Sequence, residues 1–275
     1  MTKADADLIG AARGGDTGAL DALVRRYEPR VYRFSYRLTG DADEAAEVAQ
    51  DTLLAMARSL NAFRGESALS TWLYSVARRV AIRRHRQRTR RSSRETSLDT
   101  ETTLDGDRLI ATTPTPEAAV IAHELDAAVN RALLTLNRSQ REVLVLRDIE
   151  GLTAPEVAKV LKIGVRAVKS RLHRARLSLR TALAPLVGGV AQAPSKPGCQ
   201  DVLAQFSRQL DGDLSRAACA ELAAHLERCR DCRGACASLK KVLAACRRAT
   251  PHELPKSLRL TIRQAVQRAR AEPFA

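Results

Sequence analysis

The sequence predicts an all-α protein made of three small helical modules. Glycine and proline are sparse inside the segments with helical periodicity, and the alternation of β-branched residues that is typical of strands is weak. The chain has 275 residues, which is enough for two or three small domains. Hydrophobic residues make up 45% of it and aromatic residues only 3%, so we expect small cores.

Two segments have the composition of linkers and divide the chain. Residues 91–119 are rich in Ser, Thr, Asp, Glu and Pro, and residues 188–198 read GGVAQAPSKPG. The predicted organisation is one module at 1–90, a second at 120–187 and a third at 199–250, followed by a basic tail at 251–275.

The hydropathy of the chain predicts a cytoplasmic protein without a membrane partner. The longest apolar stretch, from Leu183 to Ala193, is interrupted by Pro185 and is too short for a span. The N-terminal residues MTKADADLIG are acidic and polar, unlike a secretory signal. In a reducing cytoplasm, six cysteines confined to 199–246 indicate metal or redox chemistry, not a disulfide framework.

The charge distribution indicates a nucleic-acid partner. The net charge is +15, and acidic residues are absent between Glu66 and Glu95 and again between Glu156 and Asp201. Residues 78–94 alone hold nine arginines. Solvated helix faces usually mix acids with bases to limit self-repulsion, so two separate basic blocks favour two contacts with a polyanion.

The first module contains an acidic helix. Asp41 to Arg58 has helical periodicity, and Glu44, Glu47 and Asp51 share one face beside Gln50. A negative patch on a basic protein does not favour DNA. It indicates either a protein partner with a basic surface or a solvated face that gains from the helix dipole, and the pattern leaves both open.

An aromatic and basic segment follows that helix. Aromatic rings beside cations suit melted DNA, because unstacked bases can lie on the rings. Trp72 taken alone is explained equally well as a core residue. The candidate DNA-binding residues of this segment are Phe63, Trp72, Arg78, Arg79 and Arg83.

The second module carries a helix-turn-helix. Thr153 and Glu156 have the spacing of a capping box, so a short helix starts there. Ile163-Gly164 is the expected turn, and a second helix begins near Val165. Apolar residues form one stripe of this second helix and basic or polar residues the other, as a helix that enters a major groove requires. Its candidate DNA contacts are Arg166, Lys169, Ser170, His173 and Arg174.

The third module has the spacing of a metal site. His225 and Cys229 are four residues apart, and Cys229 and Cys232 form a CxxC knuckle. On a continuous helix Cys236 would lie about 16 Å from His225, too far to share an ion whose bonds are about 2.0–2.3 Å long. Unless the helix breaks after Cys232, the fourth ligand must come from another segment, and Cys199 is the best candidate.

Three cysteines remain outside that set. Cys219, Cys236 and Cys246 are either small apolar core residues or ligands of a second, sensing site. Thiolates at such a site would favour Cu, Cd or further Zn over hard cations. A redox switch that uses the same thiols is the alternative.

Three segments together resemble an extracytoplasmic-function sigma factor of the sigma-70 family. DADEAAEVAQDTLLAMAR at 41–58 is similar to the region that docks on core RNA polymerase, and FRGESALSTWLYSVARR at 63–79 to the region that reads the minus-ten element. LNRSQREVLVLRDIEGLTAPEVAKVLKIGVRAVKSRLHRAR at 136–176 is similar to the region that reads the minus-thirty-five element. The resemblance implies polymerase docking by Glu44, Glu47, Gln50 and Asp51, and base reading by Lys169, Ser170, His173 and Arg174, with Arg171 nearer the DNA backbone.

The third module resembles a zinc-binding anti-sigma domain through CQDVLAQFSRQLDGDLS at 199–215 and AAHLERCRDC at 223–232. Such a domain is usually a separate inhibitor, and its fusion to a sigma factor is similar to metal-responsive factors with a C-terminal cysteine-rich domain. The resemblance implies a bound Zn²⁺ and control in cis.

We therefore expect a sigma factor that binds core RNA polymerase, promoter DNA and a metal ion. A redox-regulated sigma factor is one alternative, and a helix-turn-helix regulator without a polymerase partner is another, against which the acidic helix and the aromatic segment argue. The sequence contains no phosphate loop, serine triad or open catalytic metal site, so we do not expect an enzyme.

Overall fold

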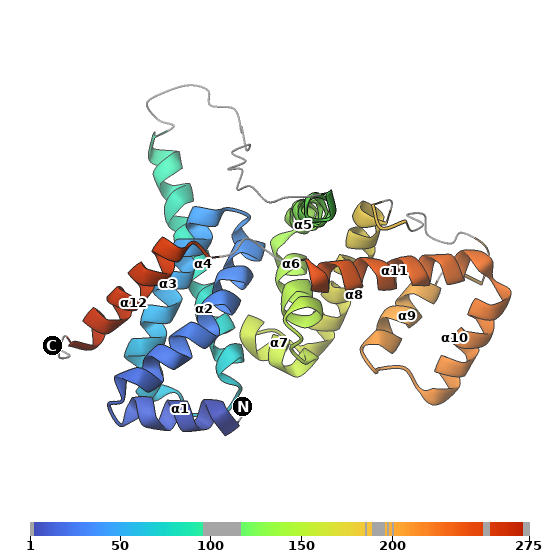
Figure 1. Ribbon diagram of the computed structural model, residues 1–275. Coiled ribbons are helices and arrows are strands. Elements are labelled where there is room, and N and C mark those ends of the chain that lie inside the picture. The colour runs from blue at the N-terminus through green and yellow to red at the C-terminus, as the bar shows by residue number, and fades with distance from the viewer. Residues whose placement is uncertain are drawn as a thin grey trace. The chain divides into compact units, whose positions relative to one another are not determined.

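The computed structural model of the protein describes residues 3–95, 117–184, 186–188, 196, 198–199, 201–249 and 254–271. Every regular element in these ranges is helical, which confirms the all-α prediction (Figure 1). The chain forms two compact units, the first from Met1–Ala122 with His252–Ala275 and the second from His123–Pro251. No helix within the described ranges has the length and hydropathy of a membrane span.

The first unit is built on long helices joined by tight corners. Its elements are α1 (Lys3–Arg13), α2 (Thr17–Thr39), α3 (Ala42–Ser59), the 3₁₀ turn η1 (Leu60–Ala62), α4 (Leu69–Glu95) and α12 (Lys256–Ala271). Gly40 ends α2 in the left-handed region at φ 78°, and the Asp41 carboxylate then accepts a hydrogen bond from the Glu44 amide to start α3. This corner lays α3 against α2, and both pack on α4. The predicted acidic helix is thus confirmed as α3.

The second unit contains the helix-turn-helix and also the cysteines. Its elements are α5 (Glu117–Thr135) from His123 onward, α6 (Arg138–Leu144), the π turn η2 (Val145–Ile149), α7 (Ala154–Leu161), α8 (Val165–Leu183), α9 (Val202–Leu210), α10 (Arg216–Arg228) and α11 (Arg230–Arg248). The sequence predicted two modules here, but α9 and α11 pack on α8 within one unit. The linker predicted at 188–198 lies mostly outside the described residues.

The helix-turn-helix consists of α7 and α8. The capping box is confirmed, because Thr153 Oγ1 accepts from the Glu156 amide while the Glu156 carboxylate accepts from the Thr153 amide. The predicted turn is shifted by one to two residues: Lys162, at φ 56°, takes the left-handed conformation that ends α7. Gly164 has an ordinary φ of −70° and directly precedes α8.

The ends of the long segments also differ from the prediction. Helix α4 continues to Glu95, and residues 96–116 of the linker predicted at 91–119 lie outside the described residues. In place of a basic tail at 251–275, α12 packs on α2 and α3. Ile262 and Val266, one helical turn apart, are buried in that contact. Because arginines surround this short apolar stripe, the composition of the segment did not predict a docked helix.

Candidate metal centre and nucleic-acid interface

Four residues of the second unit bring metal-ligating atoms together. The sulfurs of Cys199, Cys229 and Cys232 and a ring nitrogen of His225 all lie within 4.8 Å of one another. Cys199 Sγ lies 3.7 Å from His225 Nε2 and 3.9 Å from Cys229 Sγ. The structure thus assembles the four residues that the sequence spacing grouped.

A sharp corner in the chain creates this cluster. We predicted His225 and Cys229 on one helix, but α10 ends at Arg228 and Cys229 is extended, at φ −109° and ψ 104°. The Cys229 amide donates to the His225 carbonyl oxygen at 2.8 Å, and α11 starts at the next residue. The corner therefore places Cys232, in the first turn of α11, close to the last turn of α10, while Cys199 comes from the segment before α9.

The donor set suits a tetrahedral zinc ion. Bonds of about 2.0–2.3 Å place the ligand atoms of such a site about 3.5–3.8 Å apart, close to the two distances above. Hydrogen bonds from the backbone amide and the thiol of Cys232 lower the pKa of the Cys229 thiol, whereas burial raises the pKa of Cys232. The residues present therefore fit the closed coordination of a structural zinc site.

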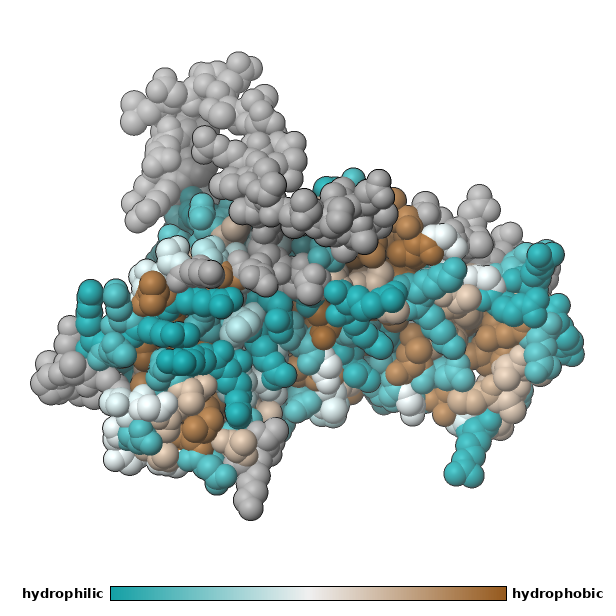
Figure 2. Space-filling view, in the orientation of Figure 1, coloured by the Kyte–Doolittle hydropathy of each residue, from teal (hydrophilic) through white to brown (hydrophobic). Residues whose placement is uncertain are grey.

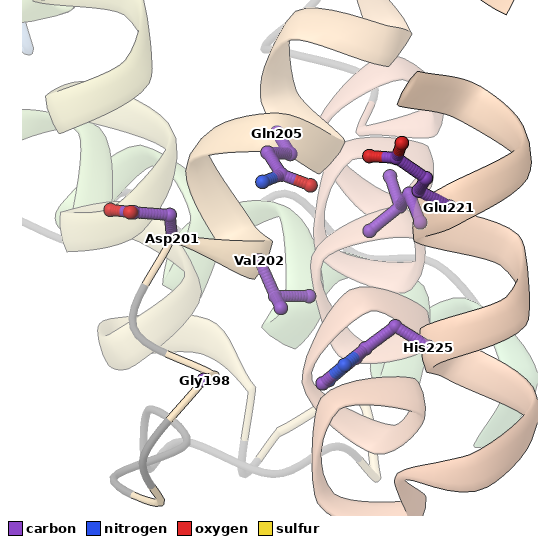
Figure 3. A pocket seen from close by; sticks show the side chains of 7 residues that line it. Gly198, Asp201, Val202, Gln205, Glu221 and His225 are labelled. Atoms are coloured by element: carbon purple, nitrogen blue, oxygen red, sulfur yellow. The ribbon is translucent and has the colours of Figure 1, made fainter. Parts of the chain in front are cut away.

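A cavity of about 240 Å³ adjoins the cluster (Figure 3). Gln205 of α9 and Glu221 of α10 lie near one end of it, and His225 lies further along α10. His225 thus lines this cavity and also belongs to the cluster. The lining residues are Gly198, Asp201, Val202, Gln205, Glu221, Leu222 and His225.

The other cysteines do not form the second metal site that we considered. Cys236 and Cys246 lie ten residues apart on α11, about 15 Å along its axis, so they do not share one ion. Burial raises the pKa of Cys236 to about 11, and this thiol packs in the same apolar cluster as Phe206. The thiol of Cys219 donates to the Leu214 carbonyl oxygen at 3.9 Å. Cys236 and Cys246 are buried, whereas Cys219 is half-buried.

Part of the predicted DNA-binding face of α8 is exposed. Arg166, Ser170 and Arg174 all face solvent, and the Arg174 guanidinium lies 3.3 Å from Ser170 Oγ. Arg171 is half-buried. The exposed guanidiniums have the reach and geometry for base edges or phosphates.

Two further residues of that face are less accessible. Lys169 is half-buried, and its Nζ lies 2.8 Å from the Asp213 carboxylate, in the turn after α9. His173 is half-buried; burial, helped by Arg176 and Arg174, lowers its pKa and favours the neutral imidazole. Lys169 therefore pairs with the turn after α9, in the cysteine-bearing region.

The basic block on α8 contains two arginines that are buried and therefore do not face DNA. Arg176 is only 2% exposed and donates to both carboxylate oxygens of Asp148, to both of Asp211 and to Ser207. Burial opposes its charge, but the hydrogen bonds and charges of the two aspartates raise the pKa of Arg176. Arg180 is equally buried. Both arginines lie in the basic block that was predicted to contact DNA. No local sequence pattern links Arg176 to an acid 28 or 35 positions away.

The acidic residues of α3 are engaged by the arginine block of α4. Arg84 pairs with Glu47 and with Asp51, at 2.9 Å from the Asp51 carboxylate. Arg88 Nη1 lies 3.1 Å from the buried Glu44. Arg83, a predicted DNA contact, is exposed and lies 3.5 Å from Asp51. Glu47 remains exposed, whereas Gln50 is half-buried.

The aromatic residues of the first unit are mainly structural. Phe63 is buried and its ring centroid lies 5.7 Å from that of Trp72, which is half-buried. The hydrophobic core encloses the ring of Phe63 in this structure, and its contact with DNA stays a prediction. Arg78 is half-buried, and Arg79 is exposed, with its Nε donating to the Ser75 carbonyl oxygen.

Comparison with known proteins identifies both sigma regions. The family model "Sigma-70 region 2" matches residues 23–91, and "Sigma-70, region 4" matches 126–179. The RNA polymerase sigma-H factor of Pseudomonas aeruginosa is 36% identical over 185 residues, which cover 66% of this chain and 95% of that protein. The chain belongs to the extracytoplasmic-function group of sigma-70 factors. The resemblance stated for the sequence is confirmed.

Other similarities cover the same regions or the cysteines. This sigma factor is 31% identical over 183 residues to the factor SigW of Bacillus subtilis, covering 65% of this chain and 96% of SigW. The structure of CnrH in complex with the cytosolic domain of CnrY is 24% identical, with a TM-score of 0.48 over 68% of this chain and 100% of that chain. The family model "Putative zinc-finger" matches 199–233, which includes all four residues of the cluster.

Proposed function

We propose that this sigma factor binds core RNA polymerase, directs it to promoters, and is regulated in cis by a C-terminal domain that holds zinc. The observation that carries the proposal is the packing of α9 and α11 on the DNA-reading helix α8 inside one compact unit. A domain attached to that helix acts at a high effective concentration and needs no separate encounter.

Promoter DNA is the partner proposed for the exposed face of α8. Arg174 is exposed on α8 and would make a bidentate contact with a guanine, with the exposed Arg166 and Ser170 on neighbouring bases or phosphates. On α4 a second basic surface surrounds an open groove of about 420 Å³. Its lining residues are Arg79, Ile82, Arg83, Arg86, Gln87 and Arg90, a composition that suits a phosphate backbone.

Core polymerase is the partner proposed for α3. Glu47 is exposed and Asp51 is half-exposed, and both pair with Arg84 across a partly solvated surface. Such exposed ion pairs contribute only about 0–1 kcal/mol each, so a basic partner surface can replace them.

Helix α9 connects the metal cluster to α8. Cys199 lies just before its first turn, and Ser207 and Asp211, near its last turn, accept hydrogen bonds from Arg176. The next turn carries Asp213, which pairs with Lys169. Zinc would fix the start of α9, and the position of α9 then determines how far Asp213 covers the DNA-reading face.

A charge-reversal experiment tests the polymerase assignment. The variant Glu47→Lys/Asp51→Lys should abolish binding to core polymerase, because it reverses the charge that the partner meets. Arg84→Gln is the matched control, since it breaks the same intramolecular pairs and leaves the acids in place. Unchanged polymerase affinity in the charge-reversed variant, or equal loss in the control, would exclude docking through these acids.

Run-off transcription tests the regulation. Purified core polymerase and the full-length sigma factor are combined under strict reduction while zinc, copper and cadmium are titrated. Wild type should respond to an ion, and Cys199→Ser should not. A wild type that ignores every ion under reduction but responds to peroxide would replace metal control by the redox alternative.

A further inference from the structure

The exposed side of α11 carries positive charge along its whole length. Its buried side packs in the apolar core of the cysteine-bearing helices, through Cys236, Leu239 and Leu243 among others. Hydrophilic side chains cover much of the surface over α11 (Figure 2). The lysines and arginines of the helix all lie on this exposed side; they are Arg230, Arg233, Lys240, Lys241, Arg247 and Arg248.

These cations are regularly spaced. Arg233, Lys240 and Arg247 follow one another at intervals of two helical turns, about 10.5 Å along the axis. Lys241 and Arg248 repeat the same interval in a second row beside the first. The exposed side of α11 therefore offers an extended basic surface, which we call the α11 stripe.

Internal ion pairs do not account for this charge. The acidic residue of the helix, Asp231, pairs with Lys196 at 2.7 Å, and no cation of the α11 stripe forms an ion pair with a carboxylate within the described ranges. The contact of Lys241 is with a neutral group, because its Nζ donates to the Gly188 carbonyl oxygen. The charge of the stripe is thus left for an external partner.

The helix itself does not gain from all of these charges. Arg247 and Arg248, in the last turn, interact favourably with the helix dipole. Arg230 and Arg233 lie in the first turn, where the dipole disfavours cations. A surface of a single sign also repels itself, and such surfaces serve to attract a charged partner. The stripe therefore indicates an anionic ligand.

A phosphate backbone fits the stripe better than an acidic protein does. Protein interfaces centre on aromatic or large apolar side chains and are depleted in lysine. The positions between the two rows hold Ala237, which is exposed, and Ala244, which is half-buried, and α11 exposes no large apolar side chain. Binding of a nucleic-acid backbone, in contrast, requires only cations that neutralise phosphates.

We propose that the α11 stripe is a second, sequence-independent DNA-binding surface, which holds phosphates of duplex DNA. The inference rests on the proposed function, because DNA is the partner proposed for α8 in the same unit. Helix α8 reads the sequence, and α11 adds affinity that depends on the backbone charge alone and falls steeply with salt. The zinc-binding region then takes part in DNA binding itself, besides regulating it.

The test measures the affinity of the zinc-loaded, full-length sigma factor for a short duplex without promoter sequence, over a range of salt concentrations. Arg233→Gln/Lys240→Gln/Arg248→Gln should make the slope of log affinity against log salt less steep by about 2.7, since each phosphate contact contributes about 0.9. Arg131→Gln/Arg208→Gln/Arg216→Gln is the matched control, because it removes the same charge at exposed positions scattered over α5, α9 and α10. The control should change the slope by less than about 1.

A second variant separates charge from side-chain shape. Arg233→Lys/Arg248→Lys keeps the charge and should retain the wild-type slope, because lysine also binds phosphate as a point charge. Loss of slope in this variant equal to that in the glutamine variant would overturn the inference.

Equal slopes for wild type and the glutamine variant, or equal changes in the glutamine variant and its control, would overturn the inference and leave the sigma-factor proposal standing. Run-off transcription with core polymerase tests the proposed function separately. Absence of promoter-directed transcription with wild type would overturn that function, whereas the salt slopes decide the role of α11.

Discussion

Two contacts attach the C-terminal third to the sigma regions, and each contains a charged side chain that is 2% exposed. In the second unit Arg176 of α8 is bonded to Asp148, Asp211 and Ser207. In the first unit, among the described residues, Glu28 of α2 has a long ion pair to Arg259 and lies near Arg263. Arg176 and Glu28 are thus buried to the same extent, but Arg176 makes several hydrogen bonds and Glu28 accepts none from the described residues.

That difference predicts that the two contacts differ in how strongly they resist separation. A fully bonded buried network loses several kcal/mol when one partner is removed, and it specifies a single arrangement. A buried carboxylate without hydrogen bonds retains most of its desolvation cost, so separation of the two surfaces restores its hydration. We infer that the zinc-binding region stays on α8, whereas α12 can leave α3.

Metal removal should have the largest effect. Structural zinc sites contribute on the order of 10 kcal/mol to the folding of small domains, so a strong chelator should unfold the cysteine-bearing helices. Hydrogen exchange of the full chain should show lost protection in α9, α10 and α11 but not in α2 or α3. Cys246→Ser, outside the cluster, should keep one zinc per chain. Equal protection with and without metal would contradict a structural zinc.

Loss of the buried guanidinium should have the next largest effect. Arg176→Ala leaves Asp148 and Asp211 buried without their partner, which should lower the free energy of unfolding of the second unit by about 3–5 kcal/mol. Arg174→Ala, two positions away and exposed, should change it by less than about 0.5 kcal/mol. Chemical denaturation followed by hydrogen exchange measures both. Similar small losses would show that the network does not fix the contact.

The sequence was sufficient for features encoded locally. Thr153 and Glu156 are three residues apart, and the CxxC spacing of Cys229 and Cys232 is a short motif, so the helix-turn-helix and the cluster were predictable. The partners of Arg176 were not, because a buried arginine and a DNA-binding arginine look alike on a helical stripe. The docking of α12 rests on Ile262 and its neighbours, whose apolar pattern is too short to stand out among arginines.

Base reading by α8 should be sensitive to one exposed arginine. Arg174→Ala should cost about 1–3 kcal/mol at one base-pair position if the guanidinium binds a guanine edge. Lys162→Ala, at the turn before α8, should weaken binding almost uniformly across sequences, as loss of a phosphate contact does. A binding-site selection with each variant measures this difference. Unaltered sequence preference in the Arg174 variant would remove that residue from the reading face.

Release of Lys169 should have the smallest effect. Asp213→Asn removes a partly exposed ion pair worth about 0.2–1 kcal/mol, so promoter DNA should bind up to about fivefold more tightly, and less so at high salt. Asp231→Asn is the control, because it makes the same charge change on α11 while its partner is Lys196. Equal increases in DNA affinity for the two variants would indicate a general charge effect and would exclude a specific effect of Asp213 on the DNA-reading face of α8.

The most direct test of the difference between the two contacts is hydrogen exchange of the zinc-loaded full chain with and without core polymerase. Binding should remove protection from the amides of α12 while those of α9 and of α8 around Arg176 stay protected. Unchanged or increased protection of α12 in the complex, or loss of protection in α9, would contradict a fixed contact on α8 and a releasable one on α3.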